Sequence, residues 1–472
     1  MDVDYSYQQT KFSRLAFIST LLLGTFTMSI SQSALSTAYP TLISAFHLSA
    51  ATIQWLTTGF MLVMCISMPL SPWLLNNFSF KTMFLGALVL FDLGSLIIVL
   101  TPLKLQSFGF AIMMLGRILE AFAVGILFPS YQTVLLTITP PAKRGSTMGL
   151  AGLVMGSALA CGPIISGLIL KFFKWQSLFV VFISLISLVI ILAASGFIKD
   201  VMPRHPSKLD WYSVFFSLGL IGLVYVFNSL AKGTGNLKVN LGLLVVSLVL
   251  LALFVYRQLQ ATNPLLDLRV LKSFNYDLAL LLTACSYIAL IVVTIIFPLY
   301  YQGVLRVSPF ISGLALVPGA VFLSLLNFLA GKLADHLGFK PTILIGMIMI
   351  SGGWYLTSNL LSFQSLTLMI ICAAIIEGGN AFVMMPAITL GSNFLSPKLV
   401  SHGTAVITTV RQVLGSAGVA LATIILTQVS DHQQMLGLTH LAATLTAFSY
   451  VCYTMLVLEL CGLGLALFIK SK

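Results

Sequence analysis

Long apolar runs, separated by short polar segments, follow one another along the whole chain. A transmembrane helix needs about 20 mainly apolar residues. Fourteen runs reach that length, and none shows the period-2 alternation of a membrane β-barrel. The pattern therefore predicts an all-α membrane protein with fourteen transmembrane helices. The expected spans are residues 14–39, 51–74, 82–102, 107–131, 146–171, 176–198, 211–231, 239–256, 277–301, 310–334, 341–359, 365–390, 402–428 and 442–469.

The composition excludes a soluble catalytic domain. Of the 472 residues, 58% are hydrophobic and 8% are charged, whereas a soluble domain carries about 25% charged residues. The longest polar interruptions are the N-terminal 12 residues and the segment near residues 199–210. The six cysteines lie within apolar runs and lack metal-ligand spacing. We therefore expect no metal site.

Basic residues predict the orientation in the membrane. The net charge of +12 comes from 24 basic and 12 acidic residues, and most Lys and Arg stand singly between apolar runs. This placement is typical of membrane topology rather than of nucleic-acid binding. With the N-terminus inside, sixteen basic residues fall on the inner side and six on the outer side. We expect a membrane protein surrounded by the lipid bilayer, with both termini in the cytoplasm.

An internal repeat indicates two related halves. Glu120 is followed nine residues later by Pro129, and Glu377 is followed nine residues later by Pro386. After each proline, a Gly-Ser-Thr or Gly-Thr loop follows at a similar distance. Internal symmetry of this kind is common in transporters, whose substrate site lies near the middle of the membrane between the halves. The predicted division is a six-helix half at 1–200, an inserted helix pair at 201–260 and a second six-helix half at 261–472.

Ionisable residues inside the spans are candidates for proton coupling. Each such residue costs roughly 2.5 to 3.5 kcal/mol on insertion scales. Arg117 and Glu120 are three apart and share a helix face. They form either a proton-coupling pair or an ion pair that only helps packing. Glu377 is the counterpart of Glu120 in the repeat, with a structural hydrogen-bonded acid as the alternative. Asp92 either pairs with Arg117 or faces a polar neighbour.

Two further charged residues of the spans have weaker interpretations. Glu459 lies near the inner end of the last span, where its side chain can extend to the membrane surface. Arg411 either binds backbone or closes an inner gate.

A deformable apolar pocket is the expected substrate site. The chain contains 18 Met and 33 Phe, which suit a pocket that accepts varied hydrophobic ligands, although such residues more often serve packing. Polar and aromatic residues of the core spans are candidates for its lining, namely Gln32, Tyr39, Trp55, Tyr300, Tyr301, Asn327 and Asn380.

Four motifs carry a resemblance to a known family. Gly331, Asp335, Gly338 and Lys340 stand in the pattern of an inner-loop motif, and residues 115–121 resemble a span-four motif with an intramembrane arginine. Residues 156–167, with Gly162 and Pro163, resemble a span-five antiporter motif. Residues 401–405, with Arg411, resemble the start of a thirteenth span. The whole chain resembles the fourteen-spanner drug:proton antiporters of the major facilitator superfamily, within them the lincomycin-efflux-like bacterial members.

This resemblance implies a major facilitator fold, with two six-helix halves plus two inserted helices. It implies no cofactor, because the proton gradient supplies the energy. In the family, the inner-loop motif is a charge-and-turn latch that biases the conformational equilibrium. The glycines of span five let helices close tightly, and its proline bends the span. The span-four arginine is implicated in proton transfer.

Some positions depart from the family pattern. In the first half, Pro72, Asn76 and Ser79 occupy the Gly-Asp-Gly positions of the inner-loop motif, so this copy lacks its carboxylate. Residues 31–36 of span one also lack an acid, whereas Glu120 replaces a glutamine of the family. These exchanges suggest that Glu120 and Asp92 carry the coupling here.

The expected function is efflux of hydrophobic, often cationic drugs in exchange for protons. The alternative is an exporter of one specific metabolite or small molecule. A membrane enzyme or channel is a third class, but the sequence has no HExxH, no intramembrane His cluster and no P-loop, so we expect no enzymatic activity. A monomer is expected, because the fold encloses its own site.

Overall fold

The computed structural model describes residues 3–5, 11–102, 106–231 and 236–470. Within them, fourteen helical segments are long and apolar enough to cross a membrane, which confirms the predicted number and the all-helical class of the membrane region. The ends differ by several residues, since the first helix continues to Phe46 and the thirteenth span covers Pro397–Met435. A small antiparallel hairpin, β1 (Val3–Tyr5) and β2 (Lys11–Ser13), precedes the helices and was not predicted.

Six spans form the first half of the chain. Span two is divided at Met68–Leu70, where Pro69 interrupts regular α-helical hydrogen bonding, and span six ends in a π turn at Ala193–Phe197. The helices are α1 (Arg14–Phe46), α2 (Ala50–Ile53), α3 (Trp55–Ser67), α4 (Ser71–Asn77), α5 (Phe80–Val99), α6 (Gln106–Ile138), α7 (Arg144–Phe172) and α8 (Gln176–Leu192).

The remaining eight spans follow in the same manner. Gly338 has a φ of +92° at the turn between two of them, a conformation that favours glycine. The helices are α9 (Trp211–Phe216), α10 (Leu218–Ala231), α11 (Leu237–Gln260), α12 (Phe274–Gly303), α13 (Pro309–Leu314), α14 (Val317–Leu337), α15 (Phe339–Leu360), α16 (Leu366–Asn393), α17 (Val400–Met435) and α18 (His440–Leu467).

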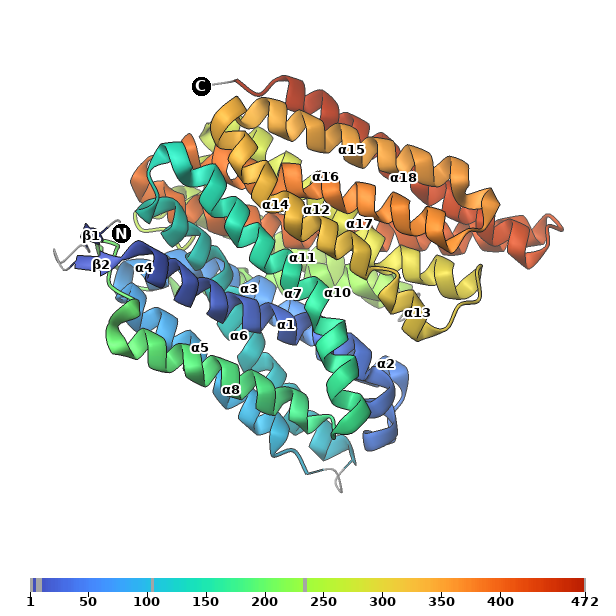
Figure 1. Cartoon of the computed structure of the whole chain (residues 1–472), viewed down its shortest axis with the longest axis horizontal. Coiled ribbons are helices and arrows are strands. Elements are labelled where there is room, and N and C mark those ends of the chain that lie inside the picture. The colour runs from blue at the N-terminus through green and yellow to red at the C-terminus, as the bar shows by residue number, and fades with distance from the viewer. Residues whose placement is uncertain (1–2, 6–10, 103–105, 232–235, 471–472) are drawn as a thin grey trace.

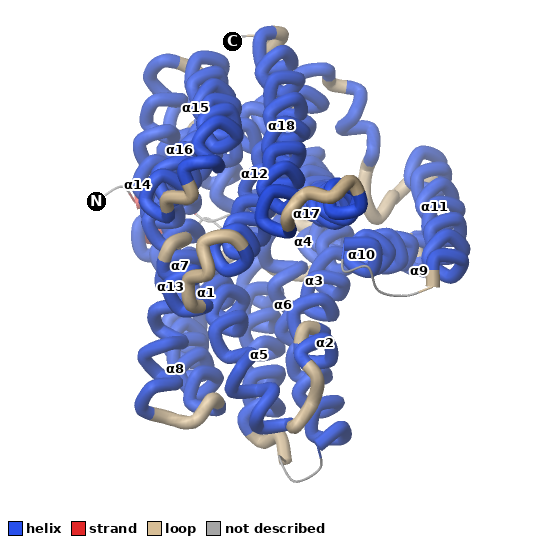
Figure 2. The backbone as a smooth tube through the Cα atoms, turned by 90° about the vertical axis from the view of Figure 1, so that its right-hand side faces the viewer, coloured by secondary structure: helices blue, strands red, loops and turns tan. Residues whose placement is uncertain are grey.

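The helices form two bundles with an additional pair at one side. In Figure 1 the blue-to-green α1 and α5 to α8 lie below the orange and red α14 to α18, and both termini lie at the same end. Figure 2 shows α10 and α11 projecting from the side of the bundles. Helix α10 packs against α3 and α17, and therefore against one helix of each half. The division at residues 200 and 260 stays a prediction that these contacts support.

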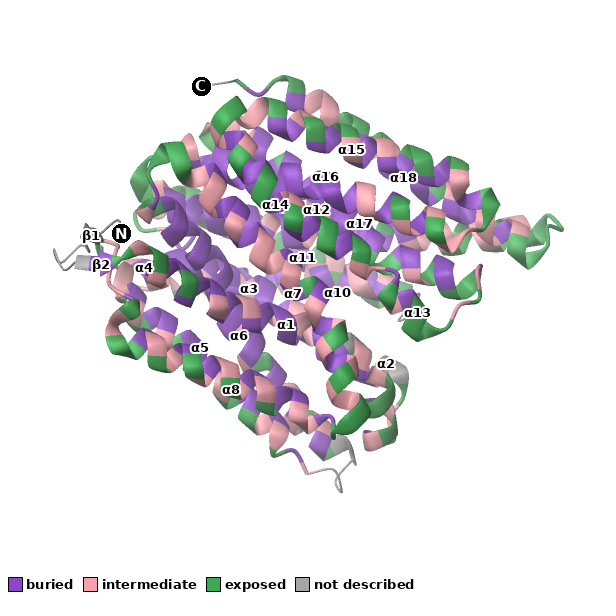
Figure 3. Cartoon of the chain, in the orientation of Figure 1, coloured by how far each residue is buried: buried purple, intermediate pink, exposed green. Residues whose placement is uncertain are grey.

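Burial follows the pattern expected in lipid. Buried residues gather on the inner helices, and the outer faces are exposed (Figure 3). These outer faces are apolar, as on α11, where Leu248 and Val249 are both more than half exposed. A chain surrounded by hydrocarbon has no need of polar residues there.

Small residues bring α7 and α14 into close contact between the halves. A Cβ added at Gly149 would lie 2.5 Å from the carbonyl oxygen of Asn327, and one at Gly156 would lie 2.8 Å from Cα of Ser324. The hydroxyls of Ser157 and Ser324 are 2.6 Å apart. Glycine and serine permit this approach, as they do in other membrane helix pairs.

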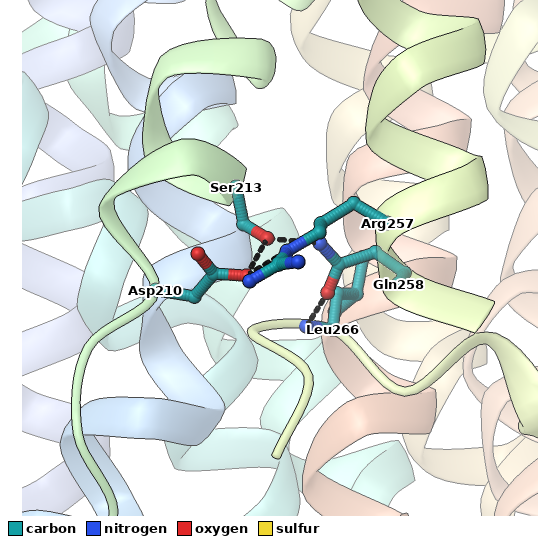
Figure 4. Close-up of polar contacts among 5 residues, drawn as sticks. All are labelled: Asp210, Ser213, Arg257, Gln258 and Leu266. Atoms are coloured by element: carbon teal, nitrogen blue, oxygen red, sulfur yellow. Dashed lines mark hydrogen bonds and ion pairs between the residues drawn. The ribbon is translucent and has the colours of Figure 1, made fainter. Parts of the chain in front are cut away.

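A polar cluster ties the inserted pair to the segment before α12 (Figure 4). Arg257 donates to Asp210 over 2.8 Å, Gln258 donates to Ser213 over 2.6 Å, and the amide of Leu266 donates to Gln258 over 3.0 Å. Burial favours the neutral form of Asp210, but the bonds from Arg257 and Ser213 outweigh it and lower the pKa of this carboxyl. The cluster thus fixes the ends of α9 and α11 beside the second half.

We predict that Gly149→Leu separates α7 from α14, because the larger side chain cannot fit against the backbone of Asn327. The measurement is disulfide formation between Ser157→Cys and Ser324→Cys in a chain without its native cysteines, read by mass spectrometry of the linked peptides. The bond forms readily in the parent and is lost in the variant. Gly167→Leu on the same helix is the control, because a Cβ there meets nothing within 4 Å. Unchanged crosslinking in Gly149→Leu would show that this contact tolerates bulk.

Candidate functional site

Arg117 and Glu120 form a fully buried ion pair on α6. The distance from Nη1 of Arg117 to Oε2 of Glu120 is 2.5 Å, and the two side chains are 1% and 0% exposed. Ser95 of α5 donates to Oε1 of Glu120 over 2.6 Å, and Ser31 of α1 accepts from Arg117 over 3.3 Å. The guanidinium also lies 4.2 Å from the ring centre of Phe60 on α3. Four helices of the first half therefore meet at this pair.

Close packing of α5 on α6 creates this arrangement. Gly94 and Gly116 face one another, and a Cβ on either would lie 2.5 Å from the carbonyl oxygen of the other. The adjacent Ser95 is thereby held within hydrogen-bonding distance of Glu120. The shared helix face expected from the three-residue spacing is confirmed, and the serine partner is an addition that the sequence did not indicate.

Asp92 faces α8 and not Arg117. Its Oδ2 accepts from Ser187 over 3.0 Å, while its buried Oδ1 has no partner among the described residues. Of the two alternatives from the sequence, the structure therefore favours the polar neighbour. Asp92 lies on α5 one turn from Ser95, which places it beside the Glu120 site without joining the ion pair.

Glu377 on α16 is buried without a polar partner. Its side chain is 4% exposed, and its Cδ would be 3.1 Å from a Cβ added at Gly319 of α14. None of the hydrogen bonds or ion pairs found in the described part of the chain involves it. Asn380, three residues later, accepts from Ser286 of α12 over 2.6 Å. The two acids of the repeat thus differ, since Glu120 is paired and Glu377 is not.

The predicted lining residues lie on several helices and make different contacts. Tyr39 hydrogen-bonds Thr57, and Gln32 is half-buried on α1. Trp55 is 40% exposed and stacks on Tyr225 of α10 at 5.9 Å, so it packs against the inserted pair.

The predicted lining residues of the second half likewise make different contacts. The buried hydroxyl of Tyr301 lacks a partner among the described residues, whereas Tyr300 donates to the carbonyl of Leu361 over 2.8 Å. Asn327 donates to Leu323 of its own helix over 2.7 Å and lies against Gly152 of α7. Asn327 therefore belongs to the contact between the halves.

Asp335 binds the first residues of α7. Its carboxylate accepts from the backbone N–H groups of Gly145 and Ser146 over 2.8 and 2.7 Å, and from the Ser146 hydroxyl over 2.5 Å. An acid at a helix N-terminus also interacts favourably with the helix dipole. The carboxylate on α14 thus holds the other half of the molecule.

The remaining motif residues lie around this contact and along α7. Gly331 packs on the backbone of Gly145, and Lys340 donates to the carbonyl of Leu467 at the end of α18 over 2.6 Å. Gly162 contacts Ser33 of α1, and Pro163 lies inside α7.

Further hydrogen bonds join the halves at the same end. Arg144 donates to Asn393 over 2.6 Å, and the hydroxyls of Thr133 and Thr404 are 2.6 Å apart. These two hydrogen bonds and those of Asp335 lie at the start of α7 or toward the end of α6, whereas Ser324 bonds Ser157 and the carbonyl of Leu153 near the middle of α7. Figure 1 shows the ribbons of the halves diverging toward α2 and α13 at the other end. No pattern in the sequence indicated a role for Asn393.

Glu459 differs from its sequence-based interpretation, and the structure bears on one of the two alternatives for Arg411. Glu459 is 0% exposed, and neither carboxylate oxygen has a partner in the described part of the chain, so it does not extend to the membrane surface. Arg411 makes no hydrogen bond to described backbone and lies with its guanidinium 5.2 Å from the ring centre of Tyr287.

The family is decided by comparison with known proteins. The family model described as Major Facilitator Superfamily matches residues 21–419. The chain belongs to this superfamily. It is a multi-pass membrane transporter by family and by its fourteen apolar helices.

Relatives within the superfamily include resistance proteins of bacteria. The chain is 35% identical to lincomycin resistance protein LmrB of Listeria monocytogenes, with 98% of both chains covered. It is 27% identical to the multidrug resistance protein B homolog of Mycobacterium tuberculosis, over 85% of this chain and 74% of the relative. Among solved structures, the proton:xylose symporter XylE matches with a TM-score of 0.67 at 15% identity, covering 97% and 96% of the two chains.

The end of the molecule at which Asp335 and Arg144 join the two halves is called the closed end. We predict that Asp335→Asn weakens the contact between the halves there. Charge-assisted hydrogen bonds contribute roughly 1.5 to 3 kcal/mol each, so loss of the charge shifts the equilibrium toward separated halves by about tenfold or more. The measurement is electron–electron double resonance between spin labels at Thr137→Cys and Ser396→Cys, both exposed positions in the wild type. We expect the population of long label-to-label distances to increase in Asp335→Asn.

The exposed Asp431 near the far end of α17 provides the control, because Asp431→Asn removes the same charge without touching the contact. If Asp335→Asn leaves the distances of the parent unchanged, Asp335 does not hold the halves together.

Proposed function

We propose that the chain exports hydrophobic, often cationic drugs from the bacterial cell in exchange for protons, by alternating access between its two halves. The observation that carries the proposal is the buried Arg117–Glu120 pair beside an interface that is closed at one end. The resistance proteins to which the chain is similar support the drug class. The proton gradient is the proposed energy source, and no cofactor is required.

Ion pairing gives Glu120 a route to proton coupling. In the closed arrangement, Arg117 neutralises the carboxylate and donates one hydrogen bond to it, and Ser95 donates a second. A buried carboxylate without a positive partner favours its protonated form, and a nearby arginine favours the ionised form. Any rearrangement that turns the Arg117 side chain away from Glu120 therefore makes Glu120 bind a proton. Asp92, one turn from Ser95, is the proposed second acid of this relay.

Glu377 is the proposed contact for a cationic substrate. It lies on α16 between α14 and α12, and it has no positive partner among the described residues. A drug with a positive charge supplies that partner, so proton and drug compete for the same carboxylate. Gln32, Tyr39, Tyr301, Asn327 and Asn380 are retained as proposed lining residues, whereas Trp55 faces the inserted pair.

Orientation and gating complete the proposal. Both termini lie at the closed end, and the excess of basic residues there supports a cytoplasmic location for this end. Asp335, with Gly331, Gly338 and Lys340, is the proposed latch of that end. Gly162 and Pro163 shape α7 against α1. The working unit is proposed to be a monomer in the lipid bilayer.

The energetics of such an exchange are sufficient. Moving one charge across 100 mV releases about 2.3 kcal/mol, which corresponds to roughly a fifty-fold concentration gradient.

The test is drug-induced proton movement in everted vesicles loaded with a pH dye. Wild type is expected to exchange protons for ethidium or lincomycin. Glu120→Gln is expected to lose proton movement by about tenfold or more, because a neutral amide cannot exchange a proton, while downhill drug flow continues. Asp431→Asn is the control for a change of charge outside the site. Proton exchange that persists in Glu120→Gln would move the coupling to Asp92 or Glu377. If no drug of a broad panel induces proton movement in wild type, the result would favour an exporter of one specific metabolite.

A further inference from the structure

Arg411 lies on the face of α17 that turns toward the first half. Thr404 touches Thr133 of α6 across the interface, and Arg411 follows Thr404 by seven residues. Seven residues are close to two helical turns, so both side chains lie on the same face, about 10.5 Å apart along the axis. Arg411 therefore projects toward the interface above the Thr133–Thr404 contact, and the hydroxyl of Tyr131 on α6 is within electrostatic reach of it.

The guanidinium of Arg411 is buried without a counter-ion. The residue is 8% exposed, and its Nη1 has neither solvent nor a hydrogen-bond partner. No described acid forms an ion pair with it. Arginine stays protonated in proteins, and an unpaired buried charge is strongly unfavourable. Arg117 is also buried, at 1% exposure, but Glu120 neutralises it. The contrast indicates that the negative partner of Arg411 does not come from the described residues of the chain.

Neighbouring side chains hold Arg411 in position. Its guanidinium lies 5.2 Å from the ring centre of Tyr287 on α12. The hydroxyl of Tyr287 donates to Gln412 over 2.8 Å, which fixes the ring beside the guanidinium. The N–H donors of the Arg411 guanidinium are therefore oriented before any ligand binds, at the interface between the halves and next to the ring of Tyr287.

We propose that Arg411 is a substrate-binding residue that recognises a carboxylate on an otherwise hydrophobic compound. This inference rests on the proposed export function and narrows its substrate class. A guanidinium presents parallel N–H donors that match the two oxygens of a carboxylate. A compound with only positive charge gains no contact with Arg411, whereas an amphoteric compound can place its cation near Glu377 and its carboxylate at Arg411.

The test uses two dyes that differ at one group: a zwitterionic rhodamine with a free carboxylate, and its ethyl ester, which is a pure cation. Binding to the purified full-length protein in detergent is followed by fluorescence polarisation. Wild type is expected to bind the carboxylate dye more tightly than the ester. Arg411→Gln is expected to weaken the carboxylate dye by about tenfold or more, and the ester by no more than about twofold.

Two further variants separate recognition from folding. Arg411→Lys keeps the charge but loses the fork, so it is expected to retain part of the preference for the carboxylate dye. Arg306→Gln removes a positive charge from an exposed position and is expected to leave both affinities unchanged. Retained ester binding in Arg411→Gln shows that the variant is folded.

Some results would overturn the proposal. These are an equal loss for both dyes in Arg411→Gln, an unchanged affinity for the carboxylate dye, or no preference in wild type. Because the binding needs no proton gradient, its outcome is independent of proton exchange in vesicles. A preference for the carboxylate dye without proton exchange would overturn the proposed coupling and support the Arg411 site. Proton exchange without that preference would support the coupling and overturn the Arg411 site.

Discussion

The arrangement of the two halves depends on the close approach of α7 and α14. Gly145, Gly149 and Gly156 leave no room for side chains along this contact, and Asp335 binds the amides at its end. In lipid, helices gain little from apolar association itself, so packing of small residues and hydrogen bonds decides which helices meet. The same weak dependence on bulk apolar burial allows such a contact to open without exposing a hydrophobic core to water.

Charge pairing distinguishes the halves more than shape does. The first half compensates its buried arginine internally, with Glu120, Ser95 and Ser31 around Arg117. The second half contains a buried acid, Glu377, and a buried base, Arg411, that form no ion pair in the described residues. Isolated charges of this kind are costly in a low-dielectric region. A second half that binds charged ligands and a first half that handles the proton would account for this asymmetry.

The sequence predicted the membrane region well, because each span is a local property of length and hydropathy. It also identified Arg117 and Glu120 as neighbours, since helical spacing alone places them on one face. It did not predict that Ser95 completes the pair, or that Asp92 faces Ser187, because both depend on how α5 packs on α6 and α8. Glu459 shows the same limit: its position near a span end suggested access to the surface, yet packing buries it completely.

The inserted pair adds a constraint that the two-half description lacks. Helix α10 packs on α3 and α17. Arg257 of α11 donates to Asp210 before α9, and Gln258 of α11 donates to Ser213 of α9. Gln258 also accepts from the amide of Leu266, in the segment that leads into α12. One residue after Leu266, the amide of Asp267 donates to His402 at the start of α17 over 3.0 Å. The pair is thus fixed to the second half by hydrogen bonds at one end. On the first half, α10 packs on α3, and the segment before α9 is hydrogen-bonded to α4 through Trp73, Asn76 and Asn77. A rocking motion that carried α10 with the second half would slide it along α3, where Trp55 and Tyr225 stack. Flat aromatic contacts tolerate such sliding better than hydrogen bonds do, because hydrogen bonds weaken steeply with misalignment.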